Sequence, residues 1–160
     1  MPRTALAKEA GLDVADGIVV DEACRTAAPD VFCAGDVASF PFVLGGRARV
    51  EHEDHARRQG RLAGRNMAGA GERYGQIPMF YSDLFDLGFE AAGQLDSRLA
   101  TVEDWLEPHR QGVVYYLDGD RRIVGVLLWN VWERLDAARE LMRGRRTWSD
   151  PGDLAGRIRP

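Results

Sequence analysis

The chain has 160 residues, of which 45% are hydrophobic and 29% are charged, and its formal net charge at pH 7 is −4. These values are typical of a globular protein, and the negative net charge excludes the basic footprint of proteins that bind nucleic acid or anionic membranes. No apolar run approaches the length of a membrane span or a signal peptide. Cys24 and Cys33 have neither CxxC spacing nor a second pair, so we expect no disulfide framework, no cysteine metal site and a reducing, cytoplasmic location.

The N-terminal segment predicts only short elements. Thr4 is placed to cap a helix over residues 4–10 that Gly11 ends, and the β-branched run 18–20 predicts a brief strand. These elements cannot bury the apolar faces that they present, because a parallel sheet needs neighbours on both sides. We therefore expect the chain to begin inside a domain whose first half is missing.

The apolar run 31–34 predicts one strand that is buried on both faces. It stops at Gly35, where a backbone without Cβ can turn sharply or approach a ligand closely. Asp36 follows at the carboxyl end of this strand, where open α/β sheets place their ligands, and its carboxylate can accept a hydrogen bond from a sugar-like hydroxyl. A buried strand that ends in an ordinary Gly-Asp turn gives the same pattern, so these residues alone leave both interpretations open.

The next segment predicts a loop and then a long helix. Residues 39–46 are punctuated by proline and glycine, which favours a loop. Residues 50–67 place acid in the first turn and arginine further along, as a helix dipole favours. The helix N-terminus also suits an anion. Small residues recur at helical spacing and predict a face that packs closely against a flat partner; they are Ala56, Gly60, Ala63, Gly64 and Met67.

The second half of the chain predicts an antiparallel sheet. Residues 76–82 are held extended by a proline, and residues 88–96 predict a strand with glycine at each end. The runs 113–117 and 123–129 flank an Asp-Gly-Asp turn and predict a hairpin. Residues 133–143 then predict an amphipathic helix. Together they predict an α+β unit in which a helix covers the sheet.

A set of motifs occurs in order along nearly the whole chain. They are GIVVD at 17–21, VFCAGD at 31–36, RVEHEDHA at 49–56, GRLAG at 60–64, MFYSD at 79–83 and GVLLWN at 125–130. The first two resemble the second flavin-binding fingerprint of the FAD-dependent pyridine nucleotide-disulfide oxidoreductases. The others narrow the resemblance to the apoptosis-inducing-factor branch, close to the ferredoxin-reductase-like flavoproteins. The resemblance implies the end of a Rossmann-like FAD- and NAD-binding region over 1–75, followed by a C-terminal reductase domain over 76–160.

The resemblance implies cofactor contacts in the first region. Asp36, directly after Gly35, would accept a hydrogen bond from the ribityl chain of FAD. His52 and Glu53 would lie beside the isoalloxazine ring, where the positive end of the helix stabilises the charge of the reduced flavin. Glu51 and His52 would also border the nicotinamide of NAD.

In the second domain the resemblance implies further contacts. Phe80 and Tyr81 match the aromatic position that packs by the flavin and stacks on nicotinamide, although tyrosine at 81 replaces the family's usual tryptophan and weakens stacking. Glu90 and Asn130 match positions that contact bound NAD. The implied reaction is hydride transfer from NAD(P)H to FAD, and then electron transfer to a redox partner protein or a small acceptor. It depends on alignment rather than on a side-chain acid or base, so no catalytic residue is assigned.

Simpler interpretations stay open for some of these residues. His52 and His55 lie three apart on one helix, and without a third ligand they are better explained as ordinary helix residues than as a metal site. Tyr81 is compatible with a half-buried strand aromatic, and Glu90 with a strand residue that faces solvent.

One departure from the family is important. The sequence contains no GxGxxG strand-turn-helix, the motif that cradles a dinucleotide pyrophosphate. We therefore expect one piece of an NAD(P)H-dependent FAD oxidoreductase, either completed by another chain that supplies the glycine-rich half or truncated from a longer chain. The alternative is a non-catalytic fragment that acts as a homodimerisation or partner-docking module, since an exposed sheet edge favours association.

Overall fold

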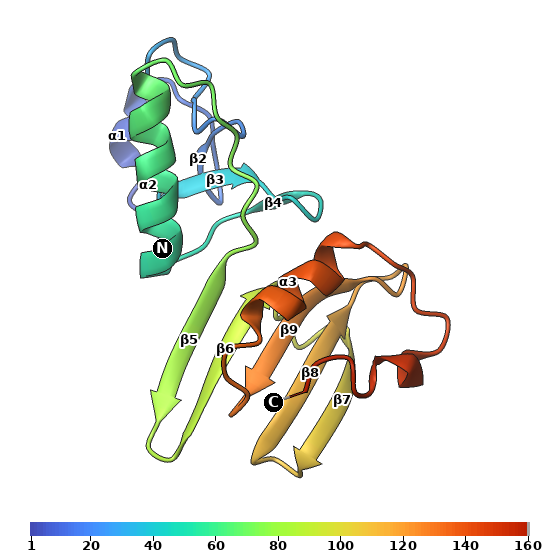
Figure 1. Cartoon of the computed structure of the whole chain (residues 1–160). Coiled ribbons are helices and arrows are strands. Elements are labelled where there is room, and N and C mark those ends of the chain that lie inside the picture. Colours follow the sequence, from blue (N-terminus) through green and yellow to red (C-terminus); the bar gives the residue numbers. More distant parts are fainter. Residues whose placement is uncertain (160) are drawn as a thin grey trace. The chain divides into compact units, whose positions relative to one another are not determined.

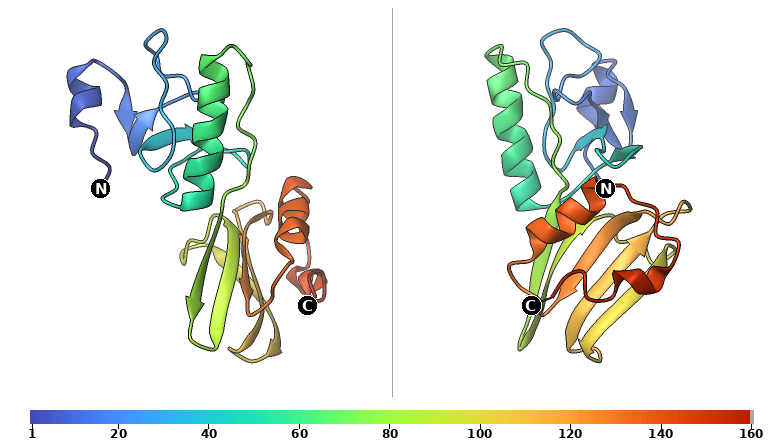
Figure 2. Two further views of the ribbon diagram at one scale, coloured as in Figure 1. Left: turned by 60° about the vertical axis from the view of Figure 1, so that its left-hand side comes forward. Right: turned by 45° about the vertical axis from the view of Figure 1, so that its right-hand side comes forward.

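The computed structural model describes residues 1–159 and divides into two compact units, Met1–Pro78 and Met79–Pro160. Figures 1 and 2 show that the first unit is built from short strands and a long helix, whereas the second is dominated by one sheet. No helix in the described part of the chain is both long and apolar enough to cross a membrane.

The first unit contains a small mixed sheet. Its elements are α1 (Ala5–Glu9), β1 (Val14–Ala15), β2 (Gly17–Val19), β3 (Ala38–Pro41), β4 (Arg47–Ala48) and α2 (Glu53–Met67). The strand order is β1-β2-β3-β4, in which β2 and β3 are parallel and the other pairs are antiparallel. The predicted N-terminal helix and the strand at 18–20 are confirmed as α1 and β2.

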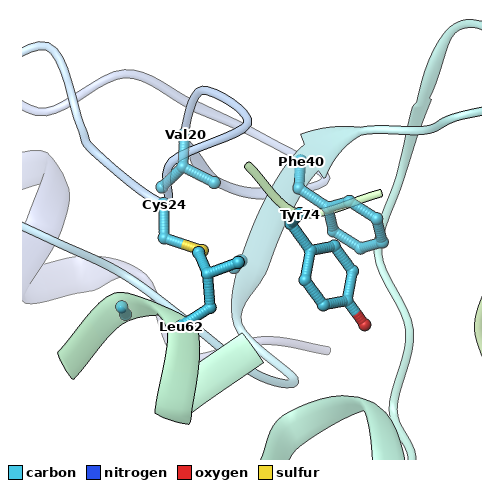
Figure 3. Packing of buried hydrophobic residues seen from close by; sticks show 7 residues of the cluster. Val20, Cys24, Phe40, Leu62 and Tyr74 are labelled. Atoms are coloured by element: carbon cyan, nitrogen blue, oxygen red, sulfur yellow. The ribbon is translucent and has the colours of Figure 1, made fainter. Parts of the chain in front are cut away.

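The core of this unit lies between α2 and β3. Figure 3 shows Phe40 of β3 beside Tyr74, and Cys24 beside Leu62 of α2. The rings of Phe40 and Tyr74 meet edge to face with centroids 5.4 Å apart, a favourable geometry for two aromatic quadrupoles. Figure 3 labels five buried side chains of this core: Val20, Cys24, Phe40, Leu62 and Tyr74.

Two predictions about the middle of this unit are wrong. Residues 31–34 do not form a buried strand: only Phe32 makes an isolated bridge, to Arg25, and Val31 is 40% exposed. The strand that pairs in parallel with β2 is β3, which begins at Ala38 and extends into the predicted loop 39–46. Burial of Phe40 outweighs the loop signal of the following proline, which sits at the end of the strand, where proline is tolerated.

The helix α2 is confirmed, but its predicted packing face is wrong. It begins at Glu53 with His52 as its N-cap. Its buried face is offset from the predicted small-residue face, and Gly60 and Gly64 are exposed. The buried side chains are His55, Gln59, Leu62, Ala63 and Asn66. Three of these five side chains are polar. The prediction is wrong because a sequence pattern places polar side chains on the solvent face unless their hydrogen-bond partners are known.

Those polar side chains are buried because most of them bond to backbone groups of neighbouring segments. The Asn66 amide donates to the carbonyls of Ala23 and Glu72, at 2.9 and 2.8 Å, and accepts from the Glu72 N–H at 2.7 Å. The buried polar atoms of α2 therefore fix the loops on either side of it, which a face of small residues could not do.

The second unit confirms the α+β prediction. Its elements are β5 (Met79–Leu84), β6 (Leu87–Gly93), β7 (Ala100–Glu107), β8 (Gln111–Leu117), β9 (Ile123–Trp129), α3 (Leu135–Arg143) and the 3₁₀ turn η1 (Pro151–Leu154). The strand order is β5-β6-β9-β8-β7, and every pair is antiparallel. The predicted hairpin is β8–β9. Helix α3 packs on β6 and β9, where Ala138 and Met142 are fully buried.

Candidate functional site

The corner formed by Gly35 and Asp36 is held in place by α2. Gly35 is buried with φ +78°, and its N–H donates to Oε1 of Gln59 at 2.7 Å. A Cβ built on Gly35 would lie 3.4 Å from the Cβ of Ala56, so the helix and the corner are in close contact. The left-handed backbone favours glycine here, whereas the space beside Ala56 would accept a Cβ at ordinary van der Waals distance.

Asp36 is exposed, while its backbone is fixed. Its carbonyl oxygen accepts a hydrogen bond from Nη1 of Arg49 at 3.0 Å. The carbonyl of the preceding Gly35 accepts from the N–H of Ala38 at 2.9 Å, so the peptide groups on both sides of Asp36 are held. The result is a carboxylate that faces solvent from a rigid backbone, the arrangement suited to accepting a hydroxyl hydrogen bond.

Arg49 connects this corner to the residues before α2. Its Nε donates to Asp16 at 2.9 Å and its Nη1 also donates to Glu51. The hydrogen bond from Arg49 holds the pKa of Glu51 below its usual range, and the two carboxylates raise the pKa of Arg49. Glu51 is therefore ionised at neutral pH and already engaged by a cation.

The first turn of α2 presents the other predicted residues of this unit. The Nδ1 of His52 accepts from the N–H of Asp54 at 3.4 Å, and this bond makes His52 the N-cap. Glu53 is exposed and pairs with Arg57 at 3.1 Å, one turn along the helix. Acid in this turn stabilises the helix through the helix dipole.

The interior beneath the corner contains a histidine that the sequence does not single out as buried. His55 is fully buried; it stacks on Phe40 with centroids 4.9 Å apart, and its Nδ1 lies 2.9 Å from the hydroxyl of Tyr74. Burial lowers the pKa of His55, and the nearby carboxylate of Asp36 opposes this shift. His55 Nε2 and Gln59 Nε2 are buried and have no hydrogen-bond partner among the described residues.

The aromatic and acidic candidates of the second unit separate onto two faces of the sheet. Tyr81 and Glu90 are direct partners across β5 and β6, so they share a face. Tyr81 is 55% exposed, and Oε2 of Glu90 is buried without a hydrogen-bond partner among residues 1–159. Phe80 faces the other way, where its ring meets Phe89 edge to face with centroids 6.1 Å apart.

Asn130 is engaged by the protein itself. Its Oδ1 accepts from the N–H of Gly88 at 2.8 Å, and its own N–H donates to the Gly88 carbonyl, also at 2.8 Å. Its backbone has φ +49°, a left-handed conformation that asparagine tolerates better than most residues. Asn130 thus ties the end of β9 to the start of β6.

The structure groups the predicted residues within each unit. In the first, Gly35, Asp36 and Glu51 are joined through two residues that the sequence does not single out, Arg49 and Gln59. In the second, Tyr81 is paired with Glu90. Among residues 1–159, no three histidine, cysteine or acidic side chains gather in a way that could hold a metal ion.

Comparison with known proteins places both halves of the chain. Residues 1–60 match the family model described as pyridine nucleotide-disulphide oxidoreductase. Residues 63–110 and 103–144 match the model described as apoptosis-inducing factor, mitochondrion-associated, C-term.

Individual relatives agree with the family models. The chain is 38% identical to apoptosis-inducing factor 1, mitochondrial, of Dictyostelium discoideum, a match that covers 96% of this chain and 32% of the relative. It is 35% identical to the ferredoxin–NAD(+) reductase component of the anthranilate 1,2-dioxygenase system of Burkholderia cepacia, over 97% of this chain and 38% of the relative.

A solved structure shows the same fold. The chain superposes on a FAD-dependent pyridine nucleotide-disulphide oxidoreductase from Desulfovibrio vulgaris with a TM-score of 0.75 and 26% identity, covering 91% of this chain and 40% of that chain. The chain thus spans between three tenths and two fifths of the length of these relatives.

Proposed function

Because the chain belongs to the apoptosis-inducing-factor branch of the pyridine nucleotide-disulphide oxidoreductase family, we propose that it forms part of an NAD(P)H-dependent FAD oxidoreductase. The observation that carries this proposal is the corner at Gly35 and Asp36, where an exposed carboxylate stands on a backbone fixed by Gln59 and Arg49. FAD, when bound, supplies the group that accepts a hydride from the nicotinamide.

The described residues fit a flavin of this kind. Asp36 would accept a hydroxyl hydrogen bond from the ribityl chain, and Gly35 would hold FAD by forming the left-handed turn that presents Asp36. His52 and Glu53 lie at the amino end of α2, whose partial positive charge suits the electron-rich edge of a reduced ring. These roles require only binding, orientation and a fixed field, so we assign no side chain to proton transfer.

Contacts to the nicotinamide cofactor are proposed separately within each unit. Glu51 and His52 border it from the first unit. In the second unit Tyr81 offers an exposed ring, and Glu90 beside it has a buried carboxylate oxygen with no partner among the described residues. An amide or hydroxyl of the nicotinamide nucleotide would satisfy that oxygen.

The other two candidates have supporting positions. Phe80 lies on the face of β5 opposite to Tyr81, so a single cofactor ring cannot stack on both. We propose that Phe80 packs beside the flavin and that its ring contact with Phe89 holds it there. Asn130 spends its side-chain oxygen on Gly88. Its Nδ2 donates to the carbonyl of Asp86 at 3.5 Å, so we propose that it contacts NAD with its remaining amide hydrogen while holding β6 to β9.

The regions 1–75 and 76–160 are proposed to be the end of the nucleotide-binding region and the C-terminal reductase domain. The Burkholderia relative is named for reduction of ferredoxin, so we propose a ferredoxin-type protein as the electron acceptor, with a small molecule as the alternative. The glycine-rich half, on a longer form of this chain or on a separate chain, is the proposed complement.

The test is reduction of bound flavin. The purified chain, completed by the glycine-rich half, is mixed with FAD under anaerobic conditions and NADH is added while the absorbance near the flavin maximum is followed. We expect bleaching by NADH, and weaker FAD binding by Asp36→Ala, because this variant lacks the acceptor for a ribityl hydroxyl. If the unsubstituted chain binds FAD no better than Asp36→Ala does, the proposal is wrong.

A second candidate function is favoured by one surface. An apolar groove of about 510 Å³ runs between α1 and the segment 31–37, and Leu6 on its wall is 81% exposed. Exposed apolar surface of this kind is typical of a contact site, so the chain would act as a non-catalytic dimerisation or docking module. A colourless protein that sediments as a stable dimer or binds the complementing half without flavin would favour this function.

A further inference from the structure

Arg49 occupies an unusual position for an arginine on the outside of a small domain. Only 15% of its side chain is exposed, and it makes three hydrogen bonds, to Asp16, to the carbonyl of Asp36 and to Glu51. Two of these partners are carboxylates from different segments and the third is a backbone group. Its planar fork of N–H groups serves all three partners at once, which a lysine ammonium on a flexible stem cannot do in the same geometry.

The backbone beneath Arg49 is shaped to admit it. A Cβ on Gly17 would lie 2.8 Å from the Cδ of Arg49 and 2.6 Å from the carbonyl oxygen of Val37. Both contacts are shorter than side-chain atoms adopt, so any other residue at 17 would displace the guanidinium or the strand. Gly17 also has φ +98°, which disfavours other residues independently. The route of Arg49 across the start of β2 is therefore built into the fold.

The two ends of this contact network have different proposed partners. Asp36 is the residue that faces the flavin, and Glu51 is the residue that borders the nicotinamide. Both hydrogen bonds come from the same atom, Nη1 of Arg49. A ligand that draws Glu51 away from Arg49 changes the orientation of the guanidinium and the strength of its hydrogen bond to the Asp36 carbonyl. A ligand that moves the Asp36 backbone changes the hydrogen bond to Glu51 in the same way.

We propose that Arg49 is a positioning residue that couples the flavin-facing corner at Asp36 to the nicotinamide-facing residue Glu51. The coupling rests on the function proposed above, and it adds that affinity for one cofactor depends on occupancy by the other. By linkage this dependence is reciprocal, and couplings between sites typically change affinity by about 5- to 150-fold. Replacing Arg49 keeps Asp36 and Glu51 in the chain and removes the hydrogen-bond donor that they share.

The coupling is first tested without any cofactor. Amide signals of Gly35, Asp36 and Val37 are recorded by ¹H–¹⁵N NMR in the 160-residue chain at neutral pH. Glu51→Gln is expected to move these signals in the wild-type background and to leave them in place when Arg49→Met is also present. Glu72→Gln is the matched control, because Glu72 accepts from Arg65 at the far end of α2 and not from Arg49. If Glu51→Gln leaves the amide signals of Gly35, Asp36 and Val37 unchanged in the wild-type background, the proposal is overturned.

The second test measures cofactor affinity. The FAD dissociation constant is determined with and without saturating NAD⁺ for the unsubstituted chain, for Arg49→Met and for the control Arg65→Met. We expect a ratio of at least about fivefold for the unsubstituted chain and for Arg65→Met, and a ratio near one for Arg49→Met. Arg49→Lys should recover only part of the ratio, because it restores charge without the fork.

The outcomes separate the two proposals. If the chain binds FAD but the ratio is unchanged by Arg49→Met, the coupling is wrong and the proposed function stands. If no variant binds FAD although Glu51→Gln moves the corner signals through Arg49, the proposed function is wrong and the network is a structural one only.

Discussion

Replacing Gln59 by leucine tests how the corner at Gly35 is held. The substitution keeps a side chain of similar size and removes the oxygen that accepts the buried Gly35 N–H at 2.7 Å. Leaving a buried N–H unsatisfied costs about 1–3 kcal/mol. The amide nitrogen of Gln59 is itself buried without a partner among residues 1–159, so its removal offsets part of that cost. We therefore expect a net loss of about 1–2 kcal/mol.

Hydrogen exchange of the Gly35 amide measures this loss locally. A loss of about 1–2 kcal/mol corresponds to faster exchange by roughly 5- to 30-fold, and far-UV circular dichroism in urea should give the matching decrease in unfolding free energy. Gln94→Leu is the control, because that side chain is exposed and lies in the other unit. If Gln59→Leu leaves both the exchange rate and the unfolding free energy unchanged, α2 does not hold the corner through this bond.

Three further predictions concern the two cores. Because burial lowers the pKa of His55, the unfolded chain binds a proton more readily than the folded chain does. The contribution of His55 to stability is therefore full above pH ~6.5 and falls below it by at most about 1.4 kcal/mol per pH unit. Urea unfolding from pH 7 to 5 should show this fall, and His55→Phe should remove it. Asn130→Ala loses the side-chain hydrogen bond to Gly88 and places alanine at φ +49°. Tryptophan fluorescence in urea should therefore report a decrease of about 1–2 kcal/mol in unfolding free energy. Asn130→Gly should lose less, because glycine adopts this φ without strain. Met142→Ala empties a fully buried position under α3 and should cost about 2–5 kcal/mol by the same assay; a loss below that range would mean that α3 is not packed on the sheet as described.

Local patterns in the sequence predict much of the second unit. The β8–β9 hairpin follows from two apolar runs rich in β-branched and aromatic residues around an Asp-Gly-Asp turn, and α3 follows from apolar residues at helical spacing. The sequence does not predict β7, because Glu103 and Asp104 interrupt its apolar residues. An edge strand tolerates such charges, and Asp104 accepts the N–H of Gly156 at 2.7 Å. That partner is 52 residues away, so no local pattern reveals it.

The first unit is harder to predict for the same reason. The run 31–34 has the composition of a buried strand, yet β3 takes the place beside β2 because Phe40 completes the core with Tyr74. The buried face of α2 is polar, and its partners lie on distant segments. Motifs in the sequence identify Asp36 and Glu51, but only the fold shows that Arg49 and Gln59 hold them.

The most direct test of the flavin assignment is the FAD affinity of Asp36→Asn compared with that of the unsubstituted chain, measured by titration calorimetry. Asparagine still accepts a ribityl hydroxyl but without the charge, so the substitution should lose about 1–1.5 kcal/mol and weaken FAD binding by roughly 5- to 12-fold. Asp83→Asn, an exposed acid on β5, should leave the affinity unchanged. Equal affinity for the unsubstituted chain and Asp36→Asn would contradict the account.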